Sequence, residues 1–148
     1  MVPLLIRDEF GDVVSEYTLD MLEDRQYYES HGYEYASGWQ ACNLVEINCA
    51  SFKSKEDALD AAKHATILAT AQAGYTASQY LPTTSERILQ RESLIGVSLT
   101  GMANCPEIAF DPKWQVEAAQ LVKSTNKKFS KMLGIGAATR TTCVKPSG

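Results

Sequence analysis

The sequence has no long hydrophobic run and no concentration of positive charge. No apolar stretch approaches the ~20 residues that a membrane-spanning helix requires. The apolar start from Val2 to Ile6 is short and is soon followed by acidic residues, unlike a signal peptide. The 148 residues include 14 Lys and Arg against 18 Asp and Glu, a formal net charge of −4, and no segment gathers the basic ones. We therefore expect a cytoplasmic protein with neither a membrane nor a nucleic acid among its partners.

Cysteine and histidine are also scarce. The four cysteines are Cys42, Cys49, Cys105 and Cys143. They show no CxxC or Cys/His spacing, so we predict no metal site, and a reducing cytosol disfavours a disulfide framework. The ordinary role of each cysteine is that of a small buried hydrophobic residue. The only histidines, His31 and His64, have no catalytic motif around them, and we expect a polar loop for His31 and a helix surface for His64.

The composition is that of a globular chain, with 45% hydrophobic and 22% charged residues, and its length suffices for one core. Residues 1–38 are acidic, rich in Tyr and irregular in pattern. Within them we predict only a short strand from Val13 to Tyr17 and a helix from Thr18 to Tyr28. The pattern sharpens from Trp39 onward, so we divide the chain into an irregular segment, 1–38, and a regular domain, 39–148.

The regular domain alternates strands with helices. In chain order we predict a strand over Leu44 to Cys49, a helix in "KEDALDAAKHATILATAQA", a short helix in "SERILQRES", a strand in "LIGVSLTG", a helix from Asp111 to Gly134 and a strand in "ATRTTCVK". Ser54, with Asp57 three residues later, is a capping signature for the first helix. This alternation predicts an α/β fold with parallel strands and crossover helices, either an open sheet or an arc of a barrel.

Each long helix has an apolar face. In the helix that follows Ser54 this face comprises Ala58, Ala61, Ala62, Ala65, Leu68 and Ala69. In the helix that begins at Asp111 it comprises Trp114, Ala118, Leu121, Val122, Phe129, Met132 and Leu133. We expect both faces to be buried against the sheet.

The C-terminal string "VKPSG" has the residue types of an anion-binding loop. Ligands in parallel α/β structures gather beyond the carboxyl ends of the strands, where this string follows a predicted strand. Lys145 supplies a cation, Ser147 a hydroxyl donor and Gly148 a backbone N–H that a phosphate can approach closely. An ordinary polar turn is the alternative. A second short pattern places Glu107 two residues after Cys105, as either a thiol beside an acid or a turn.

Three strings resemble motifs of one enzyme family. "ACNLVEINCASF" resembles the segment that carries the second redox cysteine of ribonucleotide reductases. "RESLIGVSLTGMANCPEIAFDP" is similar to a strand and turn of the adenosylcobalamin-dependent class, and "TRTTCVKPSG" to the phosphate loop of that class. The strings follow the order of the family and cover about Trp39 to Gly148. The chain thus resembles part of a ribonucleotide reductase catalytic chain.

This resemblance implies a partial arc of a ten-stranded α/β barrel. In the family a thiyl radical abstracts a hydrogen from the ribonucleotide, and two further cysteines deliver the reducing electrons and become a disulfide. By position, Cys42 is one of that pair, and Lys145, Ser147 and Gly148 hold the substrate phosphates. The implied cofactor is adenosylcobalamin, bound mainly by parts outside this chain. The implied partners are the ribonucleotide and a thioredoxin-like reductant.

The chain also departs from the family pattern. The radical cysteine of the family lies in an Asn-x-Cys-x-Glu motif upstream of the Cys42 position, where this sequence reads "YYESHGYEYASGW". We therefore expect the radical cysteine and the partner of Cys42 on other fragments of the same reductase. The resemblance gives Cys49, Cys105 and Cys143 no catalytic position, and we expect them in the core.

The chain ends at Gly148, inside the loop that resembles a phosphate loop, and this suggests a hypothesis about how the loop is completed. A terminal carboxylate at ~4 Å from a phosphate would repel it by about 4 kcal/mol. We expect Gly148 to be a splice junction or gene break, with a partner that begins with Thr or Ser to complete the loop. Two alternatives remain: a non-catalytic module derived from the same fold, and a fragment of the diphosphate-using class, which has a separate radical-generating subunit.

Overall fold

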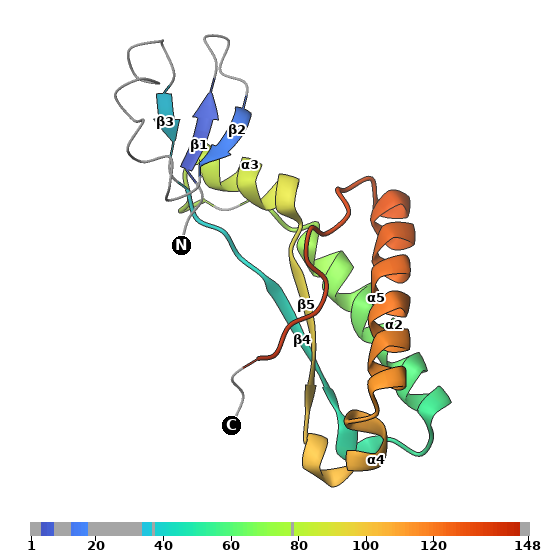
Figure 1. Cartoon of the computed structure of the whole chain (residues 1–148). Helices are drawn as coiled ribbons and strands as arrows, with labels where there is room; N and C mark the ends of the chain where they lie inside the picture. Colours follow the sequence, from blue (N-terminus) through green and yellow to red (C-terminus); the bar gives the residue numbers. More distant parts are fainter. Residues whose placement is uncertain (1–3, 8–12, 18–33, 37, 78, 146–148) are drawn as a thin grey trace. The chain divides into compact units, whose positions relative to one another are not determined.

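The computed structural model describes residues 4–7, 13–17, 34–36, 38–77 and 79–145 (Figure 1). The chain divides into two compact units, one comprising Met1–Gln40 with Ser78–Ile88 and the other Ala41–Ala77 with Leu89–Gly148. The second unit holds the parallel strands and both long helices, so the candidate site is built there.

The described part of the first unit includes a small antiparallel sheet. Its strands are β1 (Leu4–Arg7), β2 (Val13–Tyr17) and β3 (Glu34–Ala36), in the order β2-β1-β3. The predicted strand from Val13 to Tyr17 is confirmed. The predicted helix from Thr18 to Tyr28 and the predicted loop at His31 lie outside the described residues.

The second unit has a parallel pair of strands at its centre. They are β4 (Asn43–Asn48) and β5 (Ile95–Thr100), paired from Asn43 opposite Ile95 to Asn48 opposite Thr100. The chain is therefore of mixed α/β class with a small parallel sheet, as the alternating pattern predicted. Since two strands fit an open sheet and a barrel equally well, the arc of a ten-stranded barrel stays a prediction.

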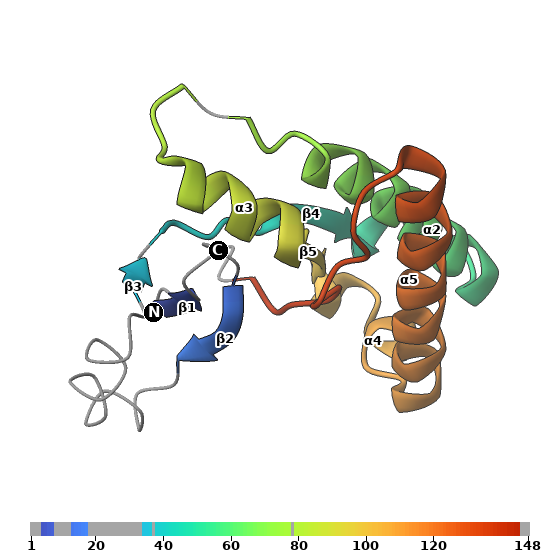
Figure 2. The ribbon, with the colours of Figure 1, turned by 90° about the horizontal axis from the view of Figure 1, so that it is seen from above.

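The two long helices lie side by side on one face of these strands (Figures 1 and 2). The helical elements are η2 (Cys49–Ser51), α2 (Lys55–Ala73), α3 (Thr83–Glu92), η3 (Met102–Asn104), α4 (Pro106–Ala109) and α5 (Pro112–Leu133). The predicted caps are confirmed: Ser54 Oγ accepts from the Asp57 N–H at 3.1 Å, and Asp111 accepts from the Lys113 N–H at 3.0 Å. Gly134 ends α5 with a φ of 71°, which a side chain rarely adopts.

Alternate strand residues and small helix residues form the main core. Its buried members are Ile47, Ala62, Ala65, Ala69, Ala73, Ile95, Val97 and Val122. The alanines of α2 bring the helix backbone close to the sheet. Trp114 of α5 centres a second cluster, where its ring lies 5.9 Å from that of Phe52 and its Nε1 donates to the Lys55 carbonyl at 3.3 Å.

The first turns of α2 and α5 are also joined by charge. Lys55 Nζ forms an ion pair with the Asp111 carboxylate, the same side chain that caps α5. The two long helices therefore begin at one place in the structure.

The predicted apolar faces of the helices are wrong at three positions. Leu68 is 56% exposed, and Met132 and Leu133 are also exposed. The two long helices instead bury small polar residues, namely Thr66, Thr70, Thr125, Asn126 and Ser130. This burial is tolerated because the hydroxyls of Thr66, Thr70 and Ser130 donate to backbone carbonyls. Thr66 Oγ1, for example, donates to the Ala62 carbonyl at 2.7 Å.

The last predicted strand, in "ATRTTCVK", is much reduced. Only Thr142 forms a bridge, parallel to Val97 of β5. The segment is held by four backbone hydrogen bonds, of which two are Val97 N–H to Thr141 O at 3.0 Å and Cys143 N–H to Val97 O at 3.3 Å. Beyond them Val144 is almost fully exposed. Residues 140–143 therefore lie along β5 as a third, incomplete parallel segment.

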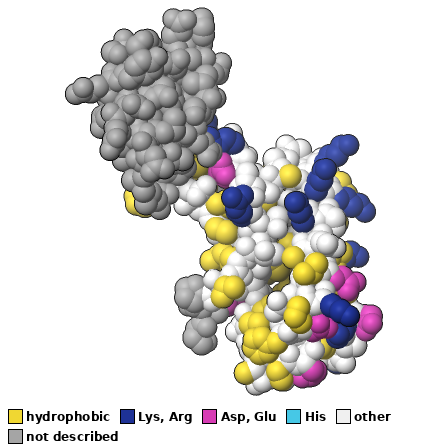
Figure 3. All heavy atoms as spheres, in the orientation of Figure 1, with side chains coloured by type: hydrophobic (Ala, Val, Ile, Leu, Met, Phe, Trp, Pro, Cys, Tyr) yellow, Lys and Arg dark blue, Asp and Glu magenta, His cyan; other side chains and the backbone are white. Residues whose placement is uncertain are grey.

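The outer side of α5 carries much of the positive charge of this unit (Figure 3). The exposed lysines of that helix are Lys113, Lys123, Lys127, Lys128 and Lys131. No helix in the part of the chain that the structure describes is both long and apolar enough to cross a membrane.

Candidate functional site

The face of β4 and β5 opposite α2 and α5, which we call the far face, gathers the chemically reactive side chains. Side chains alternate along a strand, so the burial of Val45, Ile47 and Val97 against the helices turns their neighbours to the far face. On this face lie Cys42 and Lys145, two of the residues predicted from the sequence. Far apart in the chain, they come to one face because residues 140–145 run beside β5.

Two rows of side chains run across the strands on the far face. The thiol row consists of Cys42, Gly96 and Cys143, and the charged row consists of Glu46, Ser98 and Lys145. In each row the first residue belongs to β4 or immediately precedes it, the second belongs to β5, and the third belongs to the C-terminal segment.

The thiol row depends on a glycine. A Cβ built on Gly96 would lie 2.7 Å from Cys143 Sγ, 3.2 Å from Cys42 Sγ and 2.5 Å from Leu44 Cδ2. The first and third of these are closer than real Cβ contacts, so any side chain at this position would displace its neighbours. The missing side chain leaves a gap above β5 into which the two thiols extend from opposite sides.

The Cys143 thiol acts electrostatically on Cys42. Burial, and then the neighbouring Cys143 thiol, raise the pKa of the Cys42 thiol. A raised pKa lowers the thiolate fraction near neutral pH, and the thiolate is the nucleophile in thiol chemistry. In the isolated chain Cys42 is therefore a thiol held mainly in its protonated form.

Lys145 is held in the charged row by two contacts. Its ammonium pairs with Glu46 Oε2 at 3.3 Å, and its backbone N–H donates to Ser98 Oγ at 3.3 Å. Both side chains of the pair are partly exposed, and such pairs contribute about 0–1 kcal/mol. A more strongly charged ligand can thus replace Glu46 at little cost. Ser147 and Gly148, the other predicted phosphate ligands, lie outside the described residues.

The sequence prediction missed four members of the two rows. Cys143 was expected in the core but is only half-buried and faces Cys42, while Cys49 and Cys105 are buried as expected. Glu46, Gly96 and Ser98 were not identified. The sequence did contain a signal for three of them. Residues an even number apart in a strand share a face, and Glu46 is four residues after Cys42 while Cys143 is two residues before Lys145. An isolated glycine within an apolar strand, such as Gly96, indicates that other atoms approach the backbone closely there.

The remaining candidates lie away from the far face. Cys105 Sγ donates to Glu107 Oε1 at 3.3 Å within the turn before α4, so the thiol-acid pair and the turn coexist. Burial, and then Glu107, raise the pKa of Cys105, which makes it a poor nucleophile. His64 is exposed on α2 with its Nδ1 3.4 Å from Asp60 Oδ2, as expected for a surface residue. Among the residues that the structure describes, no three His, Cys, Asp or Glu are grouped to hold a metal ion.

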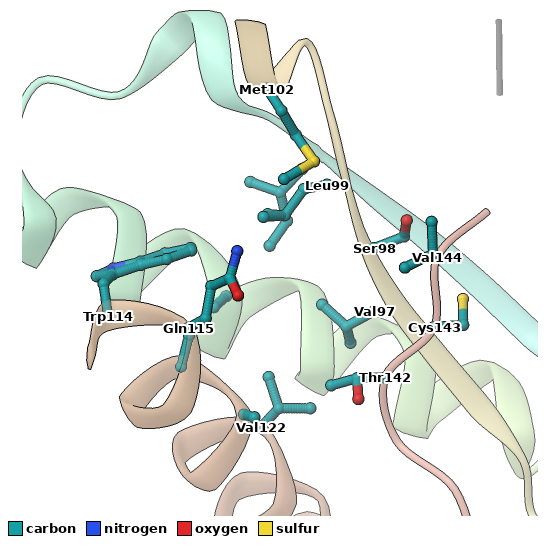
Figure 4. A pocket seen from close by; sticks show the side chains of 14 residues that line it. Val97, Ser98, Leu99, Met102, Trp114, Gln115, Val122, Thr142, Cys143 and Val144 are labelled. Carbon is teal, nitrogen blue, oxygen red and sulfur yellow. The ribbon is translucent and has the colours of Figure 1, made fainter. Parts of the chain in front are cut away.

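A cleft of about 400 Å³ lies on the helix side of β5 (Figure 4). Trp114 and Gln115 of α5 line one end, and Thr142 and Val144 of the C-terminal segment line the other. Its walls are largely apolar, with Val97 and Val122 between the ends. It offers packing surface and few polar groups, so it does not provide the chemistry of the far face.

Comparison with models of known protein families, with curated proteins and with solved structures finds no match to this chain.

A pH profile of alkylation tests the effect of the Cys143 thiol on Cys42. Because Cys143 is the second cause of the raised pKa of Cys42, Cys143→Ala should lower the pH at which Cys42 reacts with iodoacetamide. Burial, the first cause, remains, so the shift should be partial. The rate is measured from pH 6 to 11 by mass spectrometry of the Cys42 peptide. Val144→Ala, a change at an exposed neighbour, is the control and should leave the profile unchanged. An unaltered profile in Cys143→Ala contradicts the coupling.

Proposed function

We propose that this chain is part of a ribonucleotide reductase catalytic chain. Cys42 supplies one of the two reducing thiols, and Lys145, with Ser147 and Gly148, binds the substrate phosphates. The proposal is supported by the three motifs in family order. The observation that carries it is the position of Cys42 and Lys145 on one face of a parallel sheet. A ribose and its phosphates must contact both residues at once, and a common face allows this.

The proposed reaction exchanges a ribose hydroxyl for hydrogen. The ribonucleotide loses the 2′-oxygen as water, and two thiols lose two protons and two electrons and become a disulfide. Cys42 provides one thiol, and its redox partner is proposed on another fragment of the same reductase. A thioredoxin-like dithiol then reduces the disulfide by exchange and becomes oxidised itself.

Substrate binding involves the charged row in this proposal. The phosphate oxygens compete with Glu46 for the Lys145 ammonium, and a phosphate carries more charge than one carboxylate. Glu46 therefore positions the Lys145 ammonium before the substrate binds, and breaking their ion pair costs little free energy.

The described residues do not fit a cobalamin site. The far face offers thiols, a carboxylate, a hydroxyl and an ammonium, and the one histidine among the described residues, His64, lies on the exposed side of α2. We assign no residue of this chain to adenosylcobalamin and derive no step through it. The cofactor is proposed to bind other parts of the reductase.

Replacing Cys42 with serine tests the proposed role. In a complex reconstituted with the other reductase fragments, thioredoxin-dependent turnover should fall more than about 100-fold, because serine cannot deliver the electrons. Cys143→Ser is the matched control, since it removes the adjacent thiol without touching the proposed redox pair. Deoxyribonucleotide formation is measured by chromatography with reduced thioredoxin in excess.

Two outcomes separate the alternatives. If Cys42→Ser retains full turnover, or if no reductase complex forms, the non-catalytic module is favoured and the enzymatic role is rejected. If activity is independent of added cobalamin and needs a radical-generating subunit, the fragment belongs to the diphosphate-using class.

A further inference from the structure

The thiols of Cys42 and Cys143 lie close together, and the proposed reduction gives no reason for this proximity because it uses Cys42 alone. Both sulfurs lie within 3.2 Å of one point, the position of a Cβ built on Gly96. The strand that separates the two cysteines carries no side chain at this point. The nearest atom is Leu44 Cδ2 at 2.5 Å, the end of a side chain that is 43% exposed and can turn away toward solvent. The resemblance gives Cys143 no role, and Cys42 is otherwise assigned alone.

A direct disulfide between these cysteines does not fit the sheet. β5 lies between the chain segments that carry them, and two strand spacings of about 4.8 Å separate the outer segments by about 9.6 Å. A disulfide requires Cα atoms no farther apart than about 7 Å. Closing one would detach the Cys143 N–H from the Val97 carbonyl, to which it donates at 3.3 Å. A bridging atom between the sulfurs removes this difficulty.

A two-coordinate metal ion has the right span. Two metal–sulfur bonds of about 2.3 Å in line separate the sulfurs by about 4.6 Å. Because the sulfurs lie 2.7 and 3.2 Å from the same point above Gly96, they are at most about 5.9 Å apart, and this span lies within that limit. Thiolate ligands select soft ions such as Cu(I). Zinc prefers four ligands, and no third His, Cys, Asp or Glu is grouped with this pair in the described part of the chain.

We propose that Cys42 and Cys143 bind one soft, two-coordinate cation of the Cu(I) class across Gly96. Two thiols and one Cu⁺ give a bis-thiolate complex with a single negative charge and release two protons; no electron is transferred. The site uses only the geometry of the thiols, so it does not depend on the proposed reductase activity. Where that activity exists, an occupied site would block Cys42.

Titration with Cu(I) under anaerobic, reducing conditions tests the proposal on the full 148-residue chain. A chromogenic Cu(I) chelator sets the free ion concentration, and native mass spectrometry counts the bound ions. The wild-type chain should bind one ion at least about 100-fold more tightly than Cys42→Ser or Cys143→Ser, since each variant leaves one thiolate. Cys105→Ala removes a buried thiol elsewhere and should keep the site.

Gly96→Ala provides the sharpest variant because it keeps both thiols. Its methyl group occupies the point that both sulfurs approach and should abolish tight binding, while a thiol titration with Ellman's reagent after denaturation still counts four cysteines. Circular dichroism verifies that the variant is folded; if it is not, the two serine variants decide.

Three results would overturn the proposal. The first is tight binding that survives in either serine variant. The second is tight binding in folded Gly96→Ala. The third is quantitative formation of a Cys42–Cys143 disulfide by diamide without loss of secondary structure, which would show that the sulfurs meet directly.

Discussion

Replacing Trp114 with alanine should lower the free energy of unfolding by about 3–5 kcal/mol. Trp114 is 3% exposed and packs in the cluster with Phe52 and Ala118. The substitution leaves a large cavity beside the first turn of α5 and removes the indole hydrogen bond to the Lys55 carbonyl. Domains of this size have a total stability of about 5–15 kcal/mol, so the loss approaches the threshold for unfolding.

Urea denaturation followed by circular dichroism measures this effect. Val116→Ala on the same helix is the matched control, because Val116 is 58% exposed and its truncation should cost less than about 0.5 kcal/mol. Equal losses in the two variants would contradict the buried position of Trp114. Trp114→Phe keeps much of the volume and should recover more than half of the lost stability.

Replacing Asn126 with alanine should cost about 2–3 kcal/mol, although it removes no apolar contact. Asn126 is 2% exposed, its Nδ2 donates to Thr70 Oγ1 at 3.0 Å, and its Oδ1 accepts from the Ala138 N–H at 2.9 Å. One amide therefore joins α5 to α2 and to the segment that leads to Cys143. Alanine leaves the Ala138 N–H without this acceptor.

The Asn126 variant should also change the far face. Hydrogen exchange of the backbone amides should rise from Ala138 toward Cys143, because the segment loses its attachment to α5. Ser124→Ala is the control on the same helix, as its hydroxyl is exposed and bonds only the Leu121 carbonyl at 3.0 Å. Unchanged stability together with unchanged exchange in Asn126→Ala would show that the amide is not a structural link.

The sequence predicted features whose causes are local. Ser54 and Asp111 begin the two long helices through bonds to N–H groups two or three residues away, and Gly134 ends one through its own backbone conformation. The near-continuous apolar run around Val97 likewise identified a strand of the parallel sheet. Such features need no knowledge of distant residues.

The features it missed depend on distant neighbours. Leu68 was expected in the core because apolar periodicity was counted, whereas α2 and α5 meet through Thr70 and Asn126, whose polar groups satisfy each other. Cys42 and Lys145 were each identified from a motif. Their assembly with partners across β5 depends on the strand register, which one sequence does not state.

Because one side chain holds the first turns of both α2 and α5, we expect these two helix ends to unfold together. Asp111 caps α5 and at the same time holds Lys55 at the start of α2. Lys55, and then the Lys113 N–H, lower the pKa of the Asp111 carboxyl, so this attachment is intact above the ordinary aspartate range and weakens as pH falls through the lowered value. Acid would therefore loosen both helices from the same end in one step, while their opposite ends, near Ala73 and Gly134, would respond separately.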